Sequence, residues 1–317
     1  MPAILPPSSL QAHEGPDPVA HWAFSARSRD GEKLKSRLGP DATLSGEVDF
    51  QMDQYGAYAA FPGEKNIISI SSQLDDVRDL LPQKLITISA WVAVEKRQQW
   101  GGIIGVLQDN GGEESGWILG FNEKSFYFGL ASEGSNDGDG LMTYLSGKTL
   151  YEPGRYYHVV AVYDGERMHL YVNGKLDAVS EDQSGDILYP KQASWVMAGY
   201  RDRNEAHSLK GRLREIRLYD SAAQLKWIEH DFSHNAKLSE VASYVPPPKL
   251  DLVVGPYLQH GTQTAMTAMW QTTRSASSTV HYGETADCRQ SLSTSEPAFI
   301  HEVTLENLEP ETQYFYR

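Results

Sequence analysis

Residues 156–175 read YYHVVAVYDGERMHLYVNGK, and this stretch decides the fold class. Two runs of β-branched and aromatic residues, 157–163 and 168–172, are typical of strands. Asp164-Gly165 follows the first run and Asn173-Gly174 follows the second, and both dipeptides tolerate the positive φ angles that tight hairpins demand. Two such turns around one strand predict a three-stranded antiparallel meander.

Short apolar runs of the same kind recur along the chain, separated by connections rich in Gly, Asp and Asn. We expect strands over four further runs: residues 19–24, 86–94, 117–121 and 126–130. Helical spacing of apolar residues appears at 74–81, which Pro82 ends, and at 224–232. Many short strands with little helix predict an all-β protein built as a sandwich or barrel.

Composition and charge argue against several classes of protein. The chain has 317 residues, 40% of them hydrophobic, which is enough for folded cores and suggests two domains. Its formal net charge is −14 and its Lys and Arg residues are not clustered, so we expect no nucleic acid partner. Cys288 is the single cysteine, which excludes an intramolecular disulfide.

The sequence has no pattern typical of a membrane span or of a signal peptide. The chain contains no run of about 18 apolar residues, so we expect no transmembrane segment. Residues 1–12 lack the basic start and apolar centre of a signal peptide. Two interpretations stay open: the protein remains inside the cell, or a leader was removed or lies upstream.

The domain boundary is predicted at Pro246-Pro247-Pro248, because three consecutive prolines form a stiff, extended spacer. We therefore divide the chain into a disordered arm rich in Pro and polar residues, a first β-domain, a Pro-rich linker and a second β-domain. Their bounds are 1–18, 19–240, 241–250 and 251–317.

The first domain resembles the laminin G-like family within the concanavalin A-like lectin and glucanase superfamily, whose fold is a jelly-roll β-sandwich. The family's closing strand usually has Asp where this chain has Arg214, which puts in doubt a cation site built on that carboxylate. The resemblance implies glycans or cell-surface proteins as partners and a secreted or otherwise extracytoplasmic location. It rests on residues 19–22, 87–92, 157–174, 198–199 and 210–220.

Residues 251–317 resemble the fibronectin type III-like, N-terminal domain of purple acid phosphatases, an immunoglobulin-like sandwich. Tyr314 lies in the corner sequence of such sandwiches, and its hydroxyl is expected to turn back onto nearby backbone. Because the chain stops at Arg317, before the final strand or strands of this fold, we expect an incomplete sandwich. The resemblance rests on residues 255–259, 266–270, 280–283 and 301–317.

The resemblance also implies a two-metal phosphoesterase domain, which we expect only in a longer parent protein. Such centres use Asp, His and Asn ligands in short signatures such as Asp-x-His and Gly-Asn-His, and neither signature occurs. His230 and His234, four residues apart on the predicted helix, are interpreted as surface histidines. Glu215 has no evident partner, so glycoside hydrolysis, which needs two convergent acids, is the least favoured alternative.

Calcium is the one cofactor that the loop 136–140 suggests, with Asp137 and Asp139 as its candidate ligands. EF-hand spacing fails, because Ser135 and Ser146 occupy the first and twelfth positions. A calcium site of looser geometry and a solvated turn are the two interpretations that remain.

Aromatic side chains can stack on the apolar faces of sugar rings, and they can equally pack in a core. Trp22 and Trp91 lie within apolar strands and are assigned to the core. The candidates for sugar stacking are Trp100, Trp117, Tyr127, Tyr144 and Trp195.

Together these features predict the non-catalytic binding or targeting portion of a metallophosphoesterase of the purple acid phosphatase type. The rival hypothesis is a stand-alone adhesion or structural carbohydrate-binding protein, in which the second domain is only a spacer.

Overall fold

The structure, a computed structural model, describes residues 15–110, 114–135, 142–240 and 250–317. The chain divides into two compact units, Met1–Tyr244 and Val245–Arg317, and the division falls within the predicted linker. Most of the predicted arm and linker lies outside the described residues. The all-β prediction is confirmed in both units.

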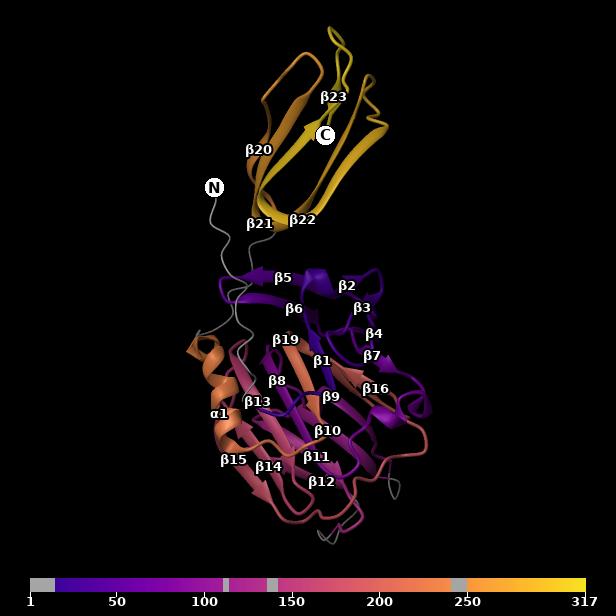
Figure 1. The fold of residues 1–317 in the computed structure, drawn as a ribbon, viewed down its shortest axis with the longest axis vertical. Helices are drawn as coiled ribbons and strands as arrows, with labels where there is room; N and C mark the ends of the chain where they lie inside the picture. Colours follow the sequence, from indigo (N-terminus) through magenta and orange to yellow (C-terminus); the bar gives the residue numbers. More distant parts are fainter. Residues whose placement is uncertain (1–14, 111–113, 136–141, 241–249) are drawn as a thin grey trace, which may run out of the picture. The chain divides into compact units, whose positions relative to one another are not determined.

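The first unit is a sandwich of two antiparallel sheets, A and B (Figure 1). Within the described residues, sheet A has eight strands, in the order β15 (Lys175–Ser180), β14 (Met168–Val172), β13 (Tyr156–Tyr163), β8 (Ile86–Val94), β19 (Lys210–Tyr219), β6 (Gly56–Pro62) and β5 (Asp49–Asp53), with β1 (Ala20–Ala23) paired to β19.

Sheet B has nine described strands, in the order β12 (Met142–Ser146), β11 (Phe126–Ala131), β10 (Ser115–Phe121), β9 (Gly101–Gln108), β16 (Trp195–Met197), β7 (Ile68–Ser71), β4 (Ala42–Thr43), β3 (Lys33–Leu34) and β2 (Arg29–Asp30). A separate hairpin, β17 (Gly199–Arg201) with β18 (Ala206–Ser208), packs against β9. The helical pattern at 74–81 forms two short 3-10 turns, Leu74–Asp76 and Arg78–Leu80.

The predicted meander is formed by β13, β14 and β15. Asn173 (φ 52°) and Gly174 (φ 75°) both adopt left-handed backbone, as the two-residue turn between β14 and β15 requires. The other connection has the four residues that separate the two predicted runs, and Gly165 takes the positive φ. There the Asp164 carboxylate stabilises the turn by accepting the Glu166 backbone N–H at 3.0 Å.

The main core lies between the sheets and contains three tryptophans with 0% exposure. Trp22 of sheet A meets Trp195 of sheet B edge to face, with ring centroids 5.7 Å apart, and Trp117 lies 6.4 Å from Trp195. Two candidates for sugar stacking, Trp117 and Trp195, are therefore wrong. Their rings join the two sheets, because each projects from the inner face of sheet B.

Helix α1 (Leu225–His234) covers the outer face of sheet A, the face turned away from sheet B (Figure 1). Trp227 and Ile228 pack in one cluster with Val160 of β13. Phe232 stacks on Trp91 of β8, with ring centroids 5.9 Å apart and an interplanar angle of 19°. The helix predicted over 224–232 is confirmed and extends two residues further.

The second unit is a smaller sheet structure of β20 (Leu252–Gln259), β21 (Met266–Gly283), β22 (Gln290–Leu305) and β23 (Phe315–Tyr316). Its core contains Ala268, Val280, Val303 and Leu305. The predicted corner is present, because the Glu309 backbone N–H donates to the Tyr314 hydroxyl at 3.0 Å.

Candidate functional site

Four aromatic residues gather on the outer face of sheet B, and we call them the aromatic face: Trp100, Tyr127, Tyr144 and Tyr200. Ring centroids of Trp100 and Tyr127 are 6.3 Å apart, and Tyr144 lies 5.9 Å from each. The structure thus brings together three of the five residues predicted to stack on sugars. Trp100 immediately precedes β9, and the three tyrosines come from β11, β12 and β17.

Glycines in the underlying strands make room for these rings. A Cβ atom at Gly120 of β10 would lie 2.4 Å from the Tyr127 ring, and one at Gly129 of β11 would lie 3.1 Å from the Tyr144 ring. A side chain at either position would push the tyrosine off the sheet. The aromatic face therefore depends on small residues whose role the sequence alone did not reveal.

Exposure distinguishes the four rings. Trp100 is 42% exposed, whereas Tyr127 and Tyr200 are 1% and 3% exposed. The plane of Trp100 makes an angle of 88° with Tyr127 and 53° with the half-buried Tyr144. The face is therefore an angled corner with one ring presented to solvent, and Tyr127 supports that ring from below.

Two carboxylates border the aromatic face. Tyr144 Oη donates to Asp109 Oδ2 at 2.5 Å, and Asp109 directly follows the last residue of β9. Tyr200 Oη donates to Asp202 Oδ2 at 3.2 Å, and Asn110 Nδ2 donates to the same oxygen at 3.1 Å. Asp202 Oδ1 also accepts the backbone N–H groups of Asn204 and Glu205, at 2.9 and 2.8 Å, so the acceptor positions of Asp202 are filled. Asp109 is partly buried and can still accept a ligand's hydroxyl group.

The tyrosines act as hydrogen-bond donors at neutral pH. Burial raises the pKa of Tyr144, and the hydrogen bond and charge of Asp109 raise it further. Burial also raises the pKa of Tyr200, to which the charges of Asp202 and Asp109 add. Both phenols therefore keep their protons and hold the two carboxylates as oriented acceptors.

Sequence reasoning missed Asp109, Asn110, Tyr200 and Asp202. Asp109-Asn110 follows an apolar strand directly, which is a signal that could have marked an acidic strand end. Asp202 is about 90 residues further along the chain, and only the packing of the β17–β18 hairpin on β9 brings it near. A Cβ at Gly102 would lie 2.2 Å from the Gly199 carbonyl oxygen, so that approach needs glycine.

The candidate calcium ligands, Asp137 and Asp139, lie outside the described residues. Within the described residues, no group of three or more His, Cys, Asp or Glu side chains is arranged to hold a metal ion. Arg214 occupies the position where the family usually has Asp. It lies at a bulge of β19, between Leu213 and Glu215. Its Nη2 contacts Asp53 Oδ2 at 2.6 Å, and its guanidinium lies 4.6 Å from the Tyr156 ring centroid.

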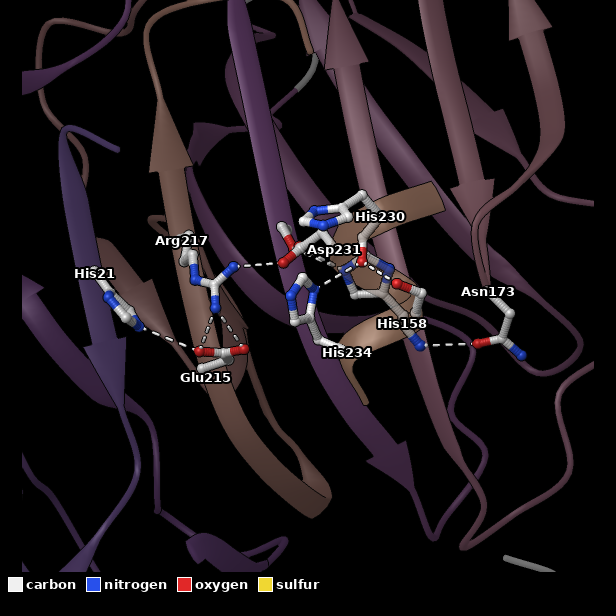
Figure 2. Close-up of polar contacts among 10 residues, drawn as sticks. His21, His158, Asn173, Glu215, Arg217, His230, Asp231 and His234 are labelled. Carbon is white, nitrogen blue, oxygen red and sulfur yellow. Dashed lines mark hydrogen bonds and ion pairs between the residues drawn. The ribbon is translucent and has the colours of Figure 1, made fainter. Parts of the chain in front are cut away.

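A second polar cluster lies on the outer face of sheet A beneath α1 (Figure 2). Asp231 of α1 contacts Arg217 Nη1 at 2.6 Å and His158 Nε2 at 3.1 Å. Arg217 also pairs with Glu215 at 2.9 Å, and Glu215 Oε2 lies 3.2 Å from His21 Nε2. We call these five residues, together with Ser89, the buried polar network.

The buried polar network has the residue types of a hydrolase triad but not its geometry. Ser89 Oγ and Asp231 Oδ2 both contact the same nitrogen of His158, at 2.9 and 3.1 Å. A triad instead uses one ring nitrogen for the serine and the other for the acid. His158 and Ser89 are also almost fully buried, so the network fixes the helix to the sheet. His230 and His234 lie exposed on α1 beside it, with ring centroids 4.4 Å apart.

In the described part of the chain, no helix is long and apolar enough to cross a membrane. A family model described as purple acid phosphatase, N-terminal domain, matches residues 254–317. A region of pappalysin-1 from Mus musculus is 27% identical over 164 residues, covering 48% of this chain, and human pappalysin-1 is 27% identical over 170 residues, covering 49%. The match spans only 10% of the length of either relative.

Two solved structures share the fold of the first unit. Domain 4 of AbnA, a GH43 extracellular arabinanase from Geobacillus stearothermophilus in complex with arabinotriose, is similar with a TM-score of 0.51 and 15% identity, over 69% of this chain and 99% of that chain. Trypanosoma rangeli sialidase in complex with 2,3-difluorosialic acid has a TM-score of 0.50 and 14% identity, over 71% of this chain and 34% of that chain. At these identities the likeness concerns the fold alone.

A further family model matches residues 65–229, more than half of the chain, and covers strands of both sheets, from β7 to β19. Its description agrees with the jelly-roll sandwich and with the resemblance noted in the sequence. The chain belongs to the concanavalin A-like lectin/glucanases superfamily.

Proposed function

We propose that the aromatic face binds carbohydrate and that the first unit is a glycan-binding module. The observation that carries this proposal is the indole of Trp100, which is 42% exposed and packed against Tyr127 and Tyr144. Apolar C–H faces of sugars pack on such rings, and a ring held by its neighbours loses little conformational entropy on binding.

Asp109 supplies the polar half of the interaction. Its carboxylate lies beside the rings as an oriented acceptor, while sugar hydroxyls are donors. Because the rings of Trp100 and Tyr144 meet at 53°, they offer no flat platform for a crystalline polysaccharide surface. A soluble chain, or the end of one, fits such a corner better.

The arabinanase domain with the same fold was solved with arabinotriose, which makes oligosaccharides the first ligand class to test here. The experiment is a soluble glycan array probed with the first unit, with Trp100→Ala, and with Tyr55→Ala as the matched control. Tyr55 is an exposed aromatic residue on the β5–β6 turn. We expect Trp100→Ala to abolish the signals that Tyr55→Ala keeps. Signals that survive Trp100→Ala unchanged would remove the aromatic face as the site.

For the whole protein, we propose a metallophosphoesterase whose glycan-binding module holds the enzyme near its substrate. The match of residues 254–317 to the purple acid phosphatase N-terminal domain supports this assignment. Tethering raises the effective concentration of enzyme at a glycan- or protein-bearing surface, and an extracytoplasmic location would suit that role. The di-metal centre belongs to a separate catalytic domain, and calcium at Asp137 and Asp139 remains a proposal for the first unit.

Phosphatase assays distinguish this proposal from the stand-alone adhesion protein. Hydrolysis of a chromogenic phosphomonoester is measured with added divalent metals, for this chain and for any longer product of the same reading frame. Metal-dependent hydrolysis in the longer product alone supports the enzyme. A longer product with no hydrolysis favours the adhesion protein.

A further inference from the structure

We infer that the aromatic face selects neutral glycans and rejects anionic ones, such as sulfated or uronic-acid polymers. This inference rests on the proposed function of the face and adds a chemical class of ligand to it. It follows from the charges that the fold places around Trp100.

The side chains that accept hydrogen bonds from Tyr144 and Tyr200 are acids. Asp109 accepts a hydrogen bond from Tyr144 at 2.5 Å, and Asp202 accepts one from Tyr200 at 3.2 Å. The charges of Asp202, Asp109 and Glu205 all raise the pKa of the Tyr200 phenol, after the larger effect of its burial. A sugar stacked on Trp100 beside Tyr144 would therefore lie within reach of more than one carboxylate.

The charge of these carboxylates favours hydroxyl groups over anions. A neutral sugar donates a hydroxyl proton to Asp109 and forms a charge-assisted hydrogen bond. A sugar carboxylate or sulfate at the same place has no proton to donate, and it adds a like charge at contact range from Asp109 and near Asp202, where salt screens the repulsion only weakly. We expect this difference to reach at least about tenfold in affinity.

Cations near the face do not reverse this charge balance. His207 stacks on Tyr200 and its Nε2 lies 3.3 Å from Glu205, so the imidazole already has an acidic neighbour. Arg203 is exposed and follows Asp202 in the chain, and it already has an interaction within the protein. Because an exposed guanidinium can attract an anionic ligand, Arg203→Ala belongs in the test.

The test is a panel of soluble glycans that includes matched pairs differing only in charge. Polygalacturonate and its methyl-esterified form make one pair, and heparin and neutral arabinan are added. Binding is measured at low and at high salt, with EDTA and separately with calcium, for the whole chain and for its variants Trp100→Ala, Asp109→Asn, Asp202→Asn and Arg203→Ala. Thermal unfolding of each variant checks that it is folded.

We expect every glycan whose binding depends on Trp100 to be neutral, and we expect Asp109→Asn or Asp202→Asn to raise the relative affinity for the charged member of a pair. Trp100-dependent binding of polygalacturonate or heparin as tight as that of neutral glycans would overturn the inference and leave the proposed function intact. The same holds if anions bind only with calcium, or only while Arg203 is present. A panel without any Trp100-dependent glycan would defeat the proposed function and the inference together.

Discussion

The two outer faces of the sandwich carry the same kinds of side chain and differ in what covers them. On sheet A, the side chains of Trp91, His158 and Ser89 face α1, and the helix buries them. Sheet B presents Trp100 and Tyr144 with Asp109 beside them, and these remain partly open to solvent. Residue type alone therefore does not separate a binding face from a packed one, and the covering element decides.

Trp91 on sheet A and Trp100 beside sheet B show this difference in exposure most clearly. Trp91 is 1% exposed, with Phe232 stacked 5.9 Å away and His158 at 5.1 Å. Trp100 has comparable aromatic neighbours, yet it is 42% exposed. Burial makes the first a source of stability, and exposure leaves the second free to stack on a ligand.

The largest expected effect separates these two tryptophans. Trp91→Ala should lower the free energy of unfolding of the first unit by about 3–5 kcal/mol, because it leaves a cavity beneath α1. Trp100→Ala should change it by less than about 1 kcal/mol. Urea denaturation of both variants measures the difference. Similar losses of unfolding free energy would contradict the distinction between a covered, stabilising face and an open one.

Asp231→Ala should destabilise the first unit by about 3 kcal/mol, because it leaves the largely buried Arg217 without its closest acidic partner. The triple variant Asp231→Leu, Arg217→Met, Glu215→Gln should recover much of that loss, since it removes both acids together with the arginine that pairs with each of them. Chemical denaturation of the wild type and the two variants gives both values. A triple variant as unstable as Asp231→Ala would show that hydrogen bonding, and not buried charge, dominates the network.

A methyl group at Gly120 should cost about 1–3 kcal/mol and disturb the aromatic face, because its Cβ would lie 2.4 Å from the Tyr127 ring. We expect Gly120→Ala to weaken glycan binding as well, since Tyr127 supports Trp100. Gly165→Ala is the control for glycine loss, as its Cβ would meet no atom within 3.6 Å. Because Gly165 has a φ of 90°, the control reports backbone strain without ring displacement.

The buried polar network should also give a modest pH dependence to stability. Burial alone would raise the pKa of Asp231, but its hydrogen bond with His158 and the charges of His158 and Arg217 outweigh burial and lower it. The pKa of Glu215 is lowered too: burial opposes this, and His21 and Arg217 outweigh burial. A lowered pKa in the folded state contributes stability above the unfolded values of 3.8 and 4.5, which is lost as the pH falls further.

Denaturation midpoints between pH 6 and about pH 3 measure this loss. Asp231→Asn should flatten the acid limb of the curve. An unaltered acid limb in Asp231→Asn would assign the pH dependence to other groups.

Local signals in the sequence predicted much of the fold. Asn173-Gly174 fixes one hairpin through two left-handed residues, and Tyr314 marks the corner of the second unit. Leu225 of α1, by contrast, keeps helical spacing with Ile228 and Phe232 but is 46% exposed, because Trp227 takes the buried position. Helical spacing alone does not distinguish Leu225 from Trp227 as the buried residue.

The site was only partly predictable from the sequence. Successive side chains of a strand point to opposite faces of the sheet, and where both sets are apolar the sequence does not show which face is open to solvent. Trp117 and Tyr127 look alike as candidates, but Trp117 points into the core and Tyr127 points to the outer face. Asp109 and Asp202 come together only through the packing of a hairpin on β9. Long-range contacts of this kind leave no local pattern.

The central claim, that the open face of sheet B binds sugar through Trp100, is tested most directly by calorimetric titration of the tightest neutral glycan from the array. Wild type, Trp100→Phe, Trp100→Ala and the control Tyr55→Ala are compared at matched thermal stability. We expect the Kd to rise in the order wild type, Trp100→Phe, Trp100→Ala, with a total change of about tenfold or more, and Tyr55→Ala to match wild type. Equal Kd values for wild type and Trp100→Ala would contradict the account.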